Sequence, residues 1–432
     1  MSFVAWAALL ITPFAIYVLS RRHFGLWALI GVELAPAVVG AFILADSGEA
    51  PYVVAWLMFA ALSVTFAGYV MTRIGFASKV GRNPREEPAV QGQSLMTRGQ
   101  ARMVAMVAIL GSAYHFSRVG IPLLASNVEV ARYDFAGSGL FGLPGRLYLF
   151  GLPLAAGLVA FESATRRMDW YRDRWTALTL FALLLTRIGS GFKSGLIEFL
   201  IYLGAIFLLI KVNPPTTARI LGRHSWAIAL AVAAVFLVGT TYQTYQASNA
   251  TLVDLLYARA TTGGAVPGVV VLTGSFPNVG QTELGLDLPY FIREYTGQPL
   301  FGQYSFSRLI SCAMLGISPL SSIPSPPVTI GAFPELTNDF GIYMAFVLMF
   351  ALGSLMAYLE VSAKWRRHPW ARFCRLVVVL AVLDYMSKGG LVYTVLNWGA
   401  IALFLALVGW ACTFVSGPRW RVGQPNAGLR RR

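Results

Sequence analysis

A glycine-rich turn that contains two cations is the first feature of this sequence that suggests anion binding. It reads Arg187-Ile-Gly-Ser-Gly-Phe-Lys193-Ser-Gly195. Guanidinium, ammonium and backbone N–H groups presented together suit a phosphate or a pyrophosphate. The alternative is that such side chains reach lipid headgroups or pair with nearby carboxylates. Other segments predicted to face the same side of a membrane contribute Arg118, Arg132, Arg146, Arg259, Arg293 and Arg308.

Two carboxylates and one histidine are candidates for proton transfer beside these cations. Glu335 and Asp339 lie four residues apart, so that in a helix they share a face at the predicted start of a membrane span. Negative charge is also favoured at a helix N-terminus, and capping therefore explains Asp339 as well as a general-base role does. His115 is the one histidine expected near the outer face. The three cysteines are scattered, and neither a metal nor a cofactor is expected.

Four further charged residues fall inside apolar segments that are predicted to cross the membrane. Glu33, Glu198 and Asp384 are the carboxylates, and Lys388 follows Asp384 by one helical turn. Because a charge inside the bilayer costs about 2.5–3.5 kcal/mol on insertion scales, each of them needs a partner. Asp384 and Lys388 can pair along one helix face, and Glu33 can neutralise Arg187 or Lys388. Internal stabilisation and a proton or ion path are both open interpretations.

The elements that carry these residues are predicted to be transmembrane helices. The chain has 432 residues, of which 56% are hydrophobic and only 12% are charged, whereas a soluble domain has about 25% charged residues. Apolar runs long enough to cross about 30 Å of hydrocarbon recur from end to end. We therefore predict an all-α polytopic membrane protein, with 1–432 as a single transmembrane domain of about eleven helices (ten to thirteen). The predicted spans are 2–19, 25–45, 51–71, 103–117, 146–161, 175–187, 195–210, 226–245, 341–359, 374–388 and 393–415, of which the last two are separated only by Lys388-Gly389-Gly390.

The distribution of positive charge predicts the orientation of these helices. Of the 34 lysines and arginines, 25 fall in alternate loops and in the C-terminal tail, as the positive-inside rule requires of the cytoplasmic side. Met1 is then outside and Arg432 inside, and the net charge of +15 reflects topology rather than nucleic-acid binding. The two large outer segments are 118–145 and 246–340. Short apolar stretches in the second segment predict interfacial or re-entrant helices on the outer end of the bundle.

Several short motifs in this order resemble the Wzy-type polymerases that join oligosaccharide repeat units of O-antigens and exopolysaccharides, including xanthan-like ones. The resemblance covers most of the chain. The motifs are Arg132 ahead of a glycine-rich stretch, the turn Gly189-Ser-Gly-Phe-Lys193-Ser-Gly195, Arg259 in Leu-Leu-Tyr-Ala-Arg-Ala, and Glu335-Leu-Thr-Asn-Asp-Phe-Gly341. The sequence departs from the family in its odd helix count, because many relatives are drawn with an even count and both ends inside.

The resemblance implies a glycosyltransferase at the periplasmic face of a bacterial inner membrane. Such an enzyme transfers a glycan from undecaprenyl pyrophosphate to a second lipid-linked repeat unit, with chain-length regulators and flippases as associated proteins. Positive charge would stabilise the pyrophosphate leaving group, and a carboxylate or histidine would accept the acceptor's proton. The base candidates are Glu335 and Asp339, with His115 behind them. By resemblance the pyrophosphate contacts are Arg132, Arg187, Lys193 and Arg259, and the outer-facing Arg308 is a further candidate.

Two other classes of protein fit the same composition. One is an O-antigen-ligase-like transferase, although ligases of that kind typically use an outer-loop histidine and 246–340 contains none. The other is a transporter or flippase of lipid-linked glycans, which is expected to show internal repeats and substrate groups on broken helices near mid-membrane.

Overall fold

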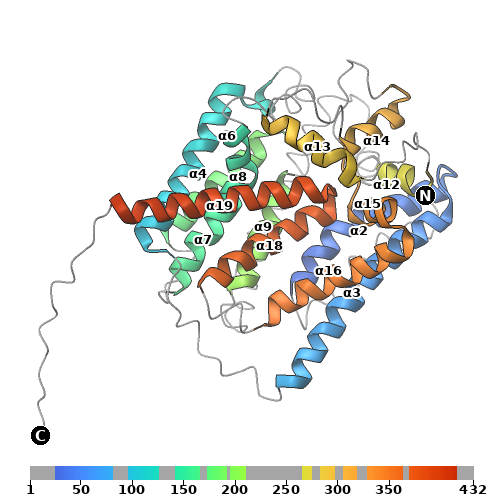
Figure 1. Ribbon diagram of the computed structural model, residues 1–432, viewed down its shortest axis with the longest axis horizontal. Helices are drawn as coiled ribbons and strands as arrows, with labels where there is room; N and C mark the ends of the chain where they lie inside the picture. The colour runs from blue at the N-terminus through green and yellow to red at the C-terminus, as the bar shows by residue number, and fades with distance from the viewer. Residues whose placement is uncertain are drawn as a thin grey trace, which may run out of the picture.

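The structure is a computed structural model in which every regular element of the described residues is a helix (Figure 1). It describes ten segments of the chain, and the statements below concern these alone. The segments are 25–80, 96–125, 142–165, 173–191, 195–210, 265–274, 283–296, 305–318, 328–362 and 369–415. Within them no strand occurs, so the prediction of an all-α protein is confirmed.

The helices on which the predicted spans mainly fall come in groups along the chain, with other helical elements between the groups. These helices are α2 (Leu26–Asp46), α3 (Tyr52–Val80), α4 (Arg98–Val119), α7 (Leu152–Thr165), α8 (Arg174–Gly189), α9 (Gly195–Ile210), α16 (Ile342–Val361), α18 (Pro369–Lys388) and α19 (Leu391–Val415). The other elements are η1 (Pro122–Leu124), α6 (Leu143–Arg146), the π-helical turn η3 (Leu147–Gly151), α12 (Val266–Leu272), α13 (Glu283–Thr296), α14 (Phe306–Leu315) and α15 (Ala332–Phe340).

Six helical stretches of the described residues are long and apolar enough to cross a membrane. They are Leu26–Asp46, Tyr52–Phe76, Arg98–Leu124, Leu143–Thr165, Ile342–Val361 and Leu391–Cys412, and each coincides with a predicted span. Three further predicted spans fall on α8, α9 and α18, which are shorter or more polar. The predicted spans 2–19 and 226–245 lie outside the described residues. The chain is therefore a helical membrane protein, and the count of eleven stays a prediction.

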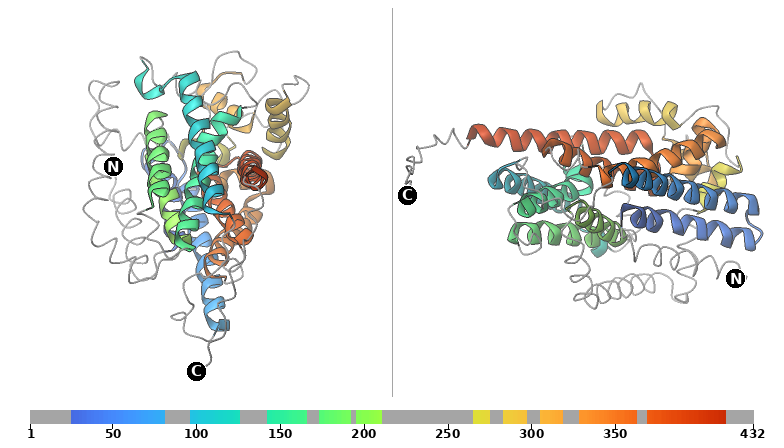
Figure 2. Two further views of the ribbon diagram at one scale, coloured as in Figure 1. Left: turned by 90° about the vertical axis from the view of Figure 1, so that its left-hand side faces the viewer. Right: turned by 90° about the horizontal axis from the view of Figure 1, so that it is seen from below.

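The helices pack around two large apolar cores, and Figures 1 and 2 show the arrangement of these helices. The first core is formed mainly by α2, α4, α7, α8, α9, α18 and α19, and the second mainly by α2, α3, α12, α15 and α16. α2, α3, α16 and α18 contribute buried residues to both cores. The stretch Leu143–Thr165 is the central element, because 83% of its most apolar window is buried against 28% for Arg98–Leu124. The short helices α12, α13 and α14 surround a third, smaller core beside α15.

Glycines allow α3 and α16 to approach each other closely. A Cβ atom added at Gly353 would overlap the backbone carbonyl oxygen of Thr65, and one at Gly68 would overlap that of Phe350. Small residues at helix interfaces are common in membrane proteins, because close packing replaces the hydrophobic driving force that water would supply. This seam makes α3 and α16 a tightly packed, parallel pair.

The N-termini of these helices are capped in two different ways. At α4 a local capping box operates, in which the Thr97 hydroxyl accepts the Gln100 N–H at 3.3 Å and the Gln100 side chain accepts the Thr97 N–H at 2.7 Å. At α2 the cap comes from far along the chain. The Leu26 N–H donates to Glu360 Oε2 at 2.8 Å, and the same buried carboxylate accepts the Tyr69 hydroxyl. Glu360 thereby fastens the start of α2 to α3 and α16.

Candidate functional site

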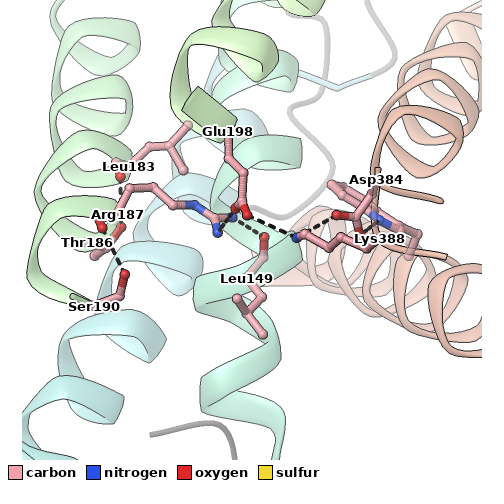
Figure 3. A network of polar contacts seen from close by, with 9 residues as sticks. Leu149, Leu183, Thr186, Arg187, Ser190, Glu198, Asp384 and Lys388 are labelled. Carbon is pink, nitrogen blue, oxygen red and sulfur yellow. Dashed lines mark hydrogen bonds and ion pairs between the residues drawn. The ribbon is translucent and has the colours of Figure 1, made fainter. Parts of the chain in front are cut away.

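A buried arginine links the C-terminal end of α8 to the N-terminal end of α9. Arg187 lies in the last turn of α8 and is 2% exposed, and its Nη1 donates to Glu198 Oε2 at 2.6 Å (Figure 3). The rings of Tyr148 and Tyr202 lie 5.2 and 5.3 Å from its guanidinium carbon, within the range of cation–π attraction. The carboxylate partner of Arg187 is thus Glu198, which corrects the alternative that Glu33 neutralises it.

The second terminal nitrogen of Arg187 binds a carbonyl that the local sequence leaves without a donor. Leu149 lies in η3, and its α-helical donor four residues later would be Pro153, which has no N–H. Arg187 Nη2 donates to the Leu149 oxygen at 2.7 Å instead. π-Helical turns of this kind often occur at functional sites. The proline therefore explains why the chain widens here and why a guanidinium fits against it.

Lys388 extends this arrangement from α9 to α18. Its Nζ lies 3.2 Å from Glu198 Oε1 and 2.7 Å from Asp384 Oδ1, one turn earlier on the same helix (Figure 3). The pairing of Asp384 with Lys388 was predicted from their spacing and is confirmed. Asp384 Oδ2 also accepts the indole N–H of Trp398 on α19 at 3.1 Å. We call Arg187, Glu198, Asp384 and Lys388 the charge network.

The charge network is electrically balanced and is accessible at one member. Two cations face two carboxylates, so the four together carry no formal net charge. The Arg187 and Asp384 side chains are 3% and 5% exposed, and that of Glu198 is 11% exposed, whereas the Lys388 side chain is 34% exposed. Lys388 is therefore the most exposed member of the charge network.

His115 lies beside this network through an aromatic contact. It is buried on α4, and its ring stacks on that of Tyr148 with centroids 6.2 Å apart and planes 9° apart. Tyr148 in turn covers the guanidinium of Arg187. The structure thus brings His115 and Arg187, two of the predicted site residues, into contact with the same tyrosine ring.

Glu335 lies at the break between α18 and α19, which follows Lys388 in the chain. We call Gly389 and Gly390, which have φ angles of 73° and 69°, the junction, and the predicted break there is confirmed. The buried carboxylate of Glu335 accepts the backbone N–H of Gly390 and, at 3.1 Å, that of Leu391. A Cβ atom at Gly389 would lie 2.5 Å from Glu335 Oε2, so the contact requires glycine there. Glu335 caps α19.

The remaining predicted residues lie apart from these contacts or outside the described residues. Glu335 and Asp339 were expected to open the ninth span, but they belong to the separate helix α15, which ends at Gly341, where φ is 78°. Asp339 is half-buried in the last turn and accepts the Asn338 side-chain amide at 2.9 Å. Arg308 lies in the first turn of α14. Arg132, Lys193 and Arg259 lie outside the described residues.

Sequence reasoning missed the aromatic side chains that surround the network. Tyr202 follows Glu198 by one helical turn, so the spacing alone places both on one face of α9. Tyr148 and Trp398 carry no such signal, because their partners come from distant helices. In the sequence the charge network is therefore recognisable from its charged residues, and not from the aromatic rings that pack against it.

No protein-family model, curated protein or solved structure matches this chain.

Proposed function

We propose that this protein is a membrane glycosyltransferase that polymerises lipid-linked oligosaccharide repeat units, using a donor carried on undecaprenyl pyrophosphate at the periplasmic face of the inner membrane. The observation that supports it most is a convergence of two motifs on which the resemblance rests. Glu198, just after the glycine-rich turn, binds Lys388 at the end of α18. Glu335, in the other motif, caps α19 by accepting the N–H of Gly390, two residues after Lys388, and that of Leu391. Two segments that are distant in sequence therefore meet at the junction.

The chemistry that we propose needs positive charge at the pyrophosphate and a base at the acceptor hydroxyl. As the bond between the sugar C1 and the pyrophosphate oxygen breaks, a cation stabilises the charge that develops on the leaving group. Lys388 is the accessible cation of the network, and we assign it this role together with Arg132 and Arg259, which lie outside the described residues. Arg187 holds the site together instead, because both terminal nitrogens are bound within the protein.

Asp339 is the base candidate that the geometry favours over Glu335. Both carboxylate oxygens of Glu335 accept backbone N–H groups, so a base role there would first require release of the α19 cap. Asp339 is half-buried in the last turn of the same short helix, where its carboxylate accepts the Asn338 side-chain amide. His115 is enclosed by aromatic rings, and its position suits support of Tyr148 more than contact with a glycan.

A transporter of lipid-linked glycans is the second candidate, and one observation favours it. The charge network places two cations and two carboxylates among apolar helices at the end of α18, and charged residues inside membrane proteins often mark ion or substrate paths. An O-antigen-ligase-like transferase would share the donor and differ only in its acceptor.

An assay of purified protein with a synthetic undecaprenyl-pyrophosphate oligosaccharide separates these candidates. With no nucleotide present, a polymerase yields a ladder of products in which each step adds one repeat unit. Lys388→Ala, Arg132→Ala and Asp339→Asn should leave single repeats, whereas Arg118→Ala, which removes an exposed cation at the end of α4, should polymerise normally. Binding of the lipid-linked glycan by the intact protein without any bond formation would reject the polymerase and favour transport.

A further inference from the structure

A small cavity lies between α2, α3, α15, α16 and α18, next to the charge network. Its volume is about 30 Å³, and its walls are mainly apolar, with Met58, Phe333, Met349 and Met386 among them. Among the described residues that line it, two have ionisable or hydroxyl groups, Glu33 from α2 and Ser387 from α18. A volume of this size is close to the share of one molecule in liquid water, so the cavity admits one small occupant.

Glu33 is the group in this cavity that needs a partner. Its side chain is half-buried, interacts with the Ser387 hydroxyl, and lies within electrostatic reach of Lys388 and Glu198. Within the residues that the structure describes, Glu33 forms no ion pair, because Lys388 is bound to Asp384 and Glu198. α3, α15 and α16 contribute no titratable side chain to the cavity wall.

Glu33 adds a third carboxylate to the two cations and two carboxylates of the charge network, counted over the residues that the structure describes. An ionised carboxylate inside a membrane protein is costly, and such residues often mark sites at which an ion or a proton is bound. A cation or a proton at Glu33 itself would remove this cost.

The end of α18 adds oxygen atoms beside the same cavity. The carbonyl oxygens of Met386 and Ser387 lie 3.8 and 4.0 Å from the position that a Cβ atom at Gly331 would take. All three residues line the cavity, and glycine at 331 leaves the space before these oxygens free. The C-terminus of a helix carries a partial negative charge, which attracts a cation.

We propose that this cavity binds one small monovalent cation, Na⁺ or a proton, on Glu33 with the Ser387 hydroxyl as a second ligand. Carboxylate, hydroxyl and carbonyl oxygens are the ligands that hard cations take in proteins. A bound cation neutralises Glu33 and leaves Lys388 with Asp384 and Glu198. An empty site draws the Lys388 ammonium towards Glu33, away from the network and the junction.

Thermal unfolding of the purified full chain in lipid nanodiscs tests this proposal and identifies the cation. The melting temperature is measured at constant ionic strength in NaCl and in choline chloride, and then in choline chloride from mildly acidic to mildly alkaline pH. If Na⁺ is the occupant, NaCl raises the melting temperature of the native protein. If a proton is the occupant, the melting temperature depends on pH alone. Glu33→Gln keeps the shape of the side chain and removes its charge, so it should abolish the response to Na⁺ or reduce the response to pH to that of the remaining ionisable groups.

Two further variants keep the interpretation clear. Glu49→Gln removes an exposed carboxylate between α2 and α3 and should retain the dependence of the native protein. Ser387→Ala, which removes one ligand and leaves Glu33 intact, should shift the response to higher Na⁺ concentration or to lower pH. Equal responses of the native protein and Glu33→Gln to both Na⁺ and pH would overturn the proposal. The glycan polymerisation assay is independent of this experiment. Neither a response to the cation nor its absence decides whether the protein is a polymerase.

Discussion

At the scale of single residues, the buried pair of Arg187 and Glu198 is expected to have a large effect on stability. Arg187→Met removes the donors that Arg187 supplies to Glu198 Oε2 and to the Leu149 carbonyl, while Lys388 stays beside Glu198 Oε1. Removing one partner of a buried ion pair costs about 3–5 kcal/mol, because the remaining charge stays desolvated. We therefore expect a lowered melting temperature for Arg187→Met in detergent, measured against the exposed control Arg118→Met.

A double variant distinguishes an ion pair from simple loss of packing. Combining Arg187→Met with Glu198→Met leaves Lys388 paired with Asp384, so the remaining charges balance. The loss in the double variant should be smaller than the sum of the two single losses. Strictly additive losses would mean that the two side chains contribute independently.

The sequence predicts part of this site because local spacing determines part of it. The Asp384–Lys388 pair follows from one helical turn and is confirmed at 2.7 Å. The partner of Arg187 depends on how α8 packs against α9, and spacing along one helix carries no information on that choice. Glu335 is similar, since its backbone partners at Gly390 and Leu391 lie on a different helix.

At the scale of helices, the glycine seam between α3 and α16 should tolerate no side chain. Gly353→Val would push a branched side chain into the backbone of α3 at Thr65, and we expect a destabilisation of at least about 2 kcal/mol. Gly399→Ala on α19 is the matched control, because nothing lies within 4 Å of its added Cβ atom. The control should be neutral or stabilising by up to about 1 kcal/mol, owing to its higher helix propensity. Thermal unfolding of both variants measures the difference, and equal melting temperatures would argue against close packing at this seam.

Helix positions were predictable to within a few residues where an apolar run is long and its ends are marked. The predicted spans 25–45 and 341–359 agree closely with α2 and α16. Helices shorter than a membrane span were harder to predict, because hydrophobic periodicity alone does not reveal them. α15 was therefore read as the start of the ninth span, although Gly341 ends it. Caps supplied by distant carboxylates were not predictable from local sequence either.

At the scale of the whole molecule, the orientation predicted from the charge bias can be tested by labelling. With the native cysteines Cys312, Cys374 and Cys412 replaced, Glu49→Cys should react with a membrane-impermeant thiol reagent in intact cells. Gly99→Cys, in the first turn of α4, should react only after permeabilisation. Both positions are exposed, so a difference between them reports sidedness. The reverse pattern would invert the orientation and place the junction at the cytoplasmic face.

The cap that Glu360 provides for α2 has a consequence for how the protein is made. Leu26 leaves the ribosome more than three hundred residues before the carboxylate that accepts its N–H, since the two are 334 positions apart. During that interval the newly inserted helix must hold its first turn by other means, such as interfacial water or the translocation machinery. Final closure of the bundle therefore awaits the synthesis of α16, and a chain interrupted before Glu360 would present an unfinished helix end to membrane quality control.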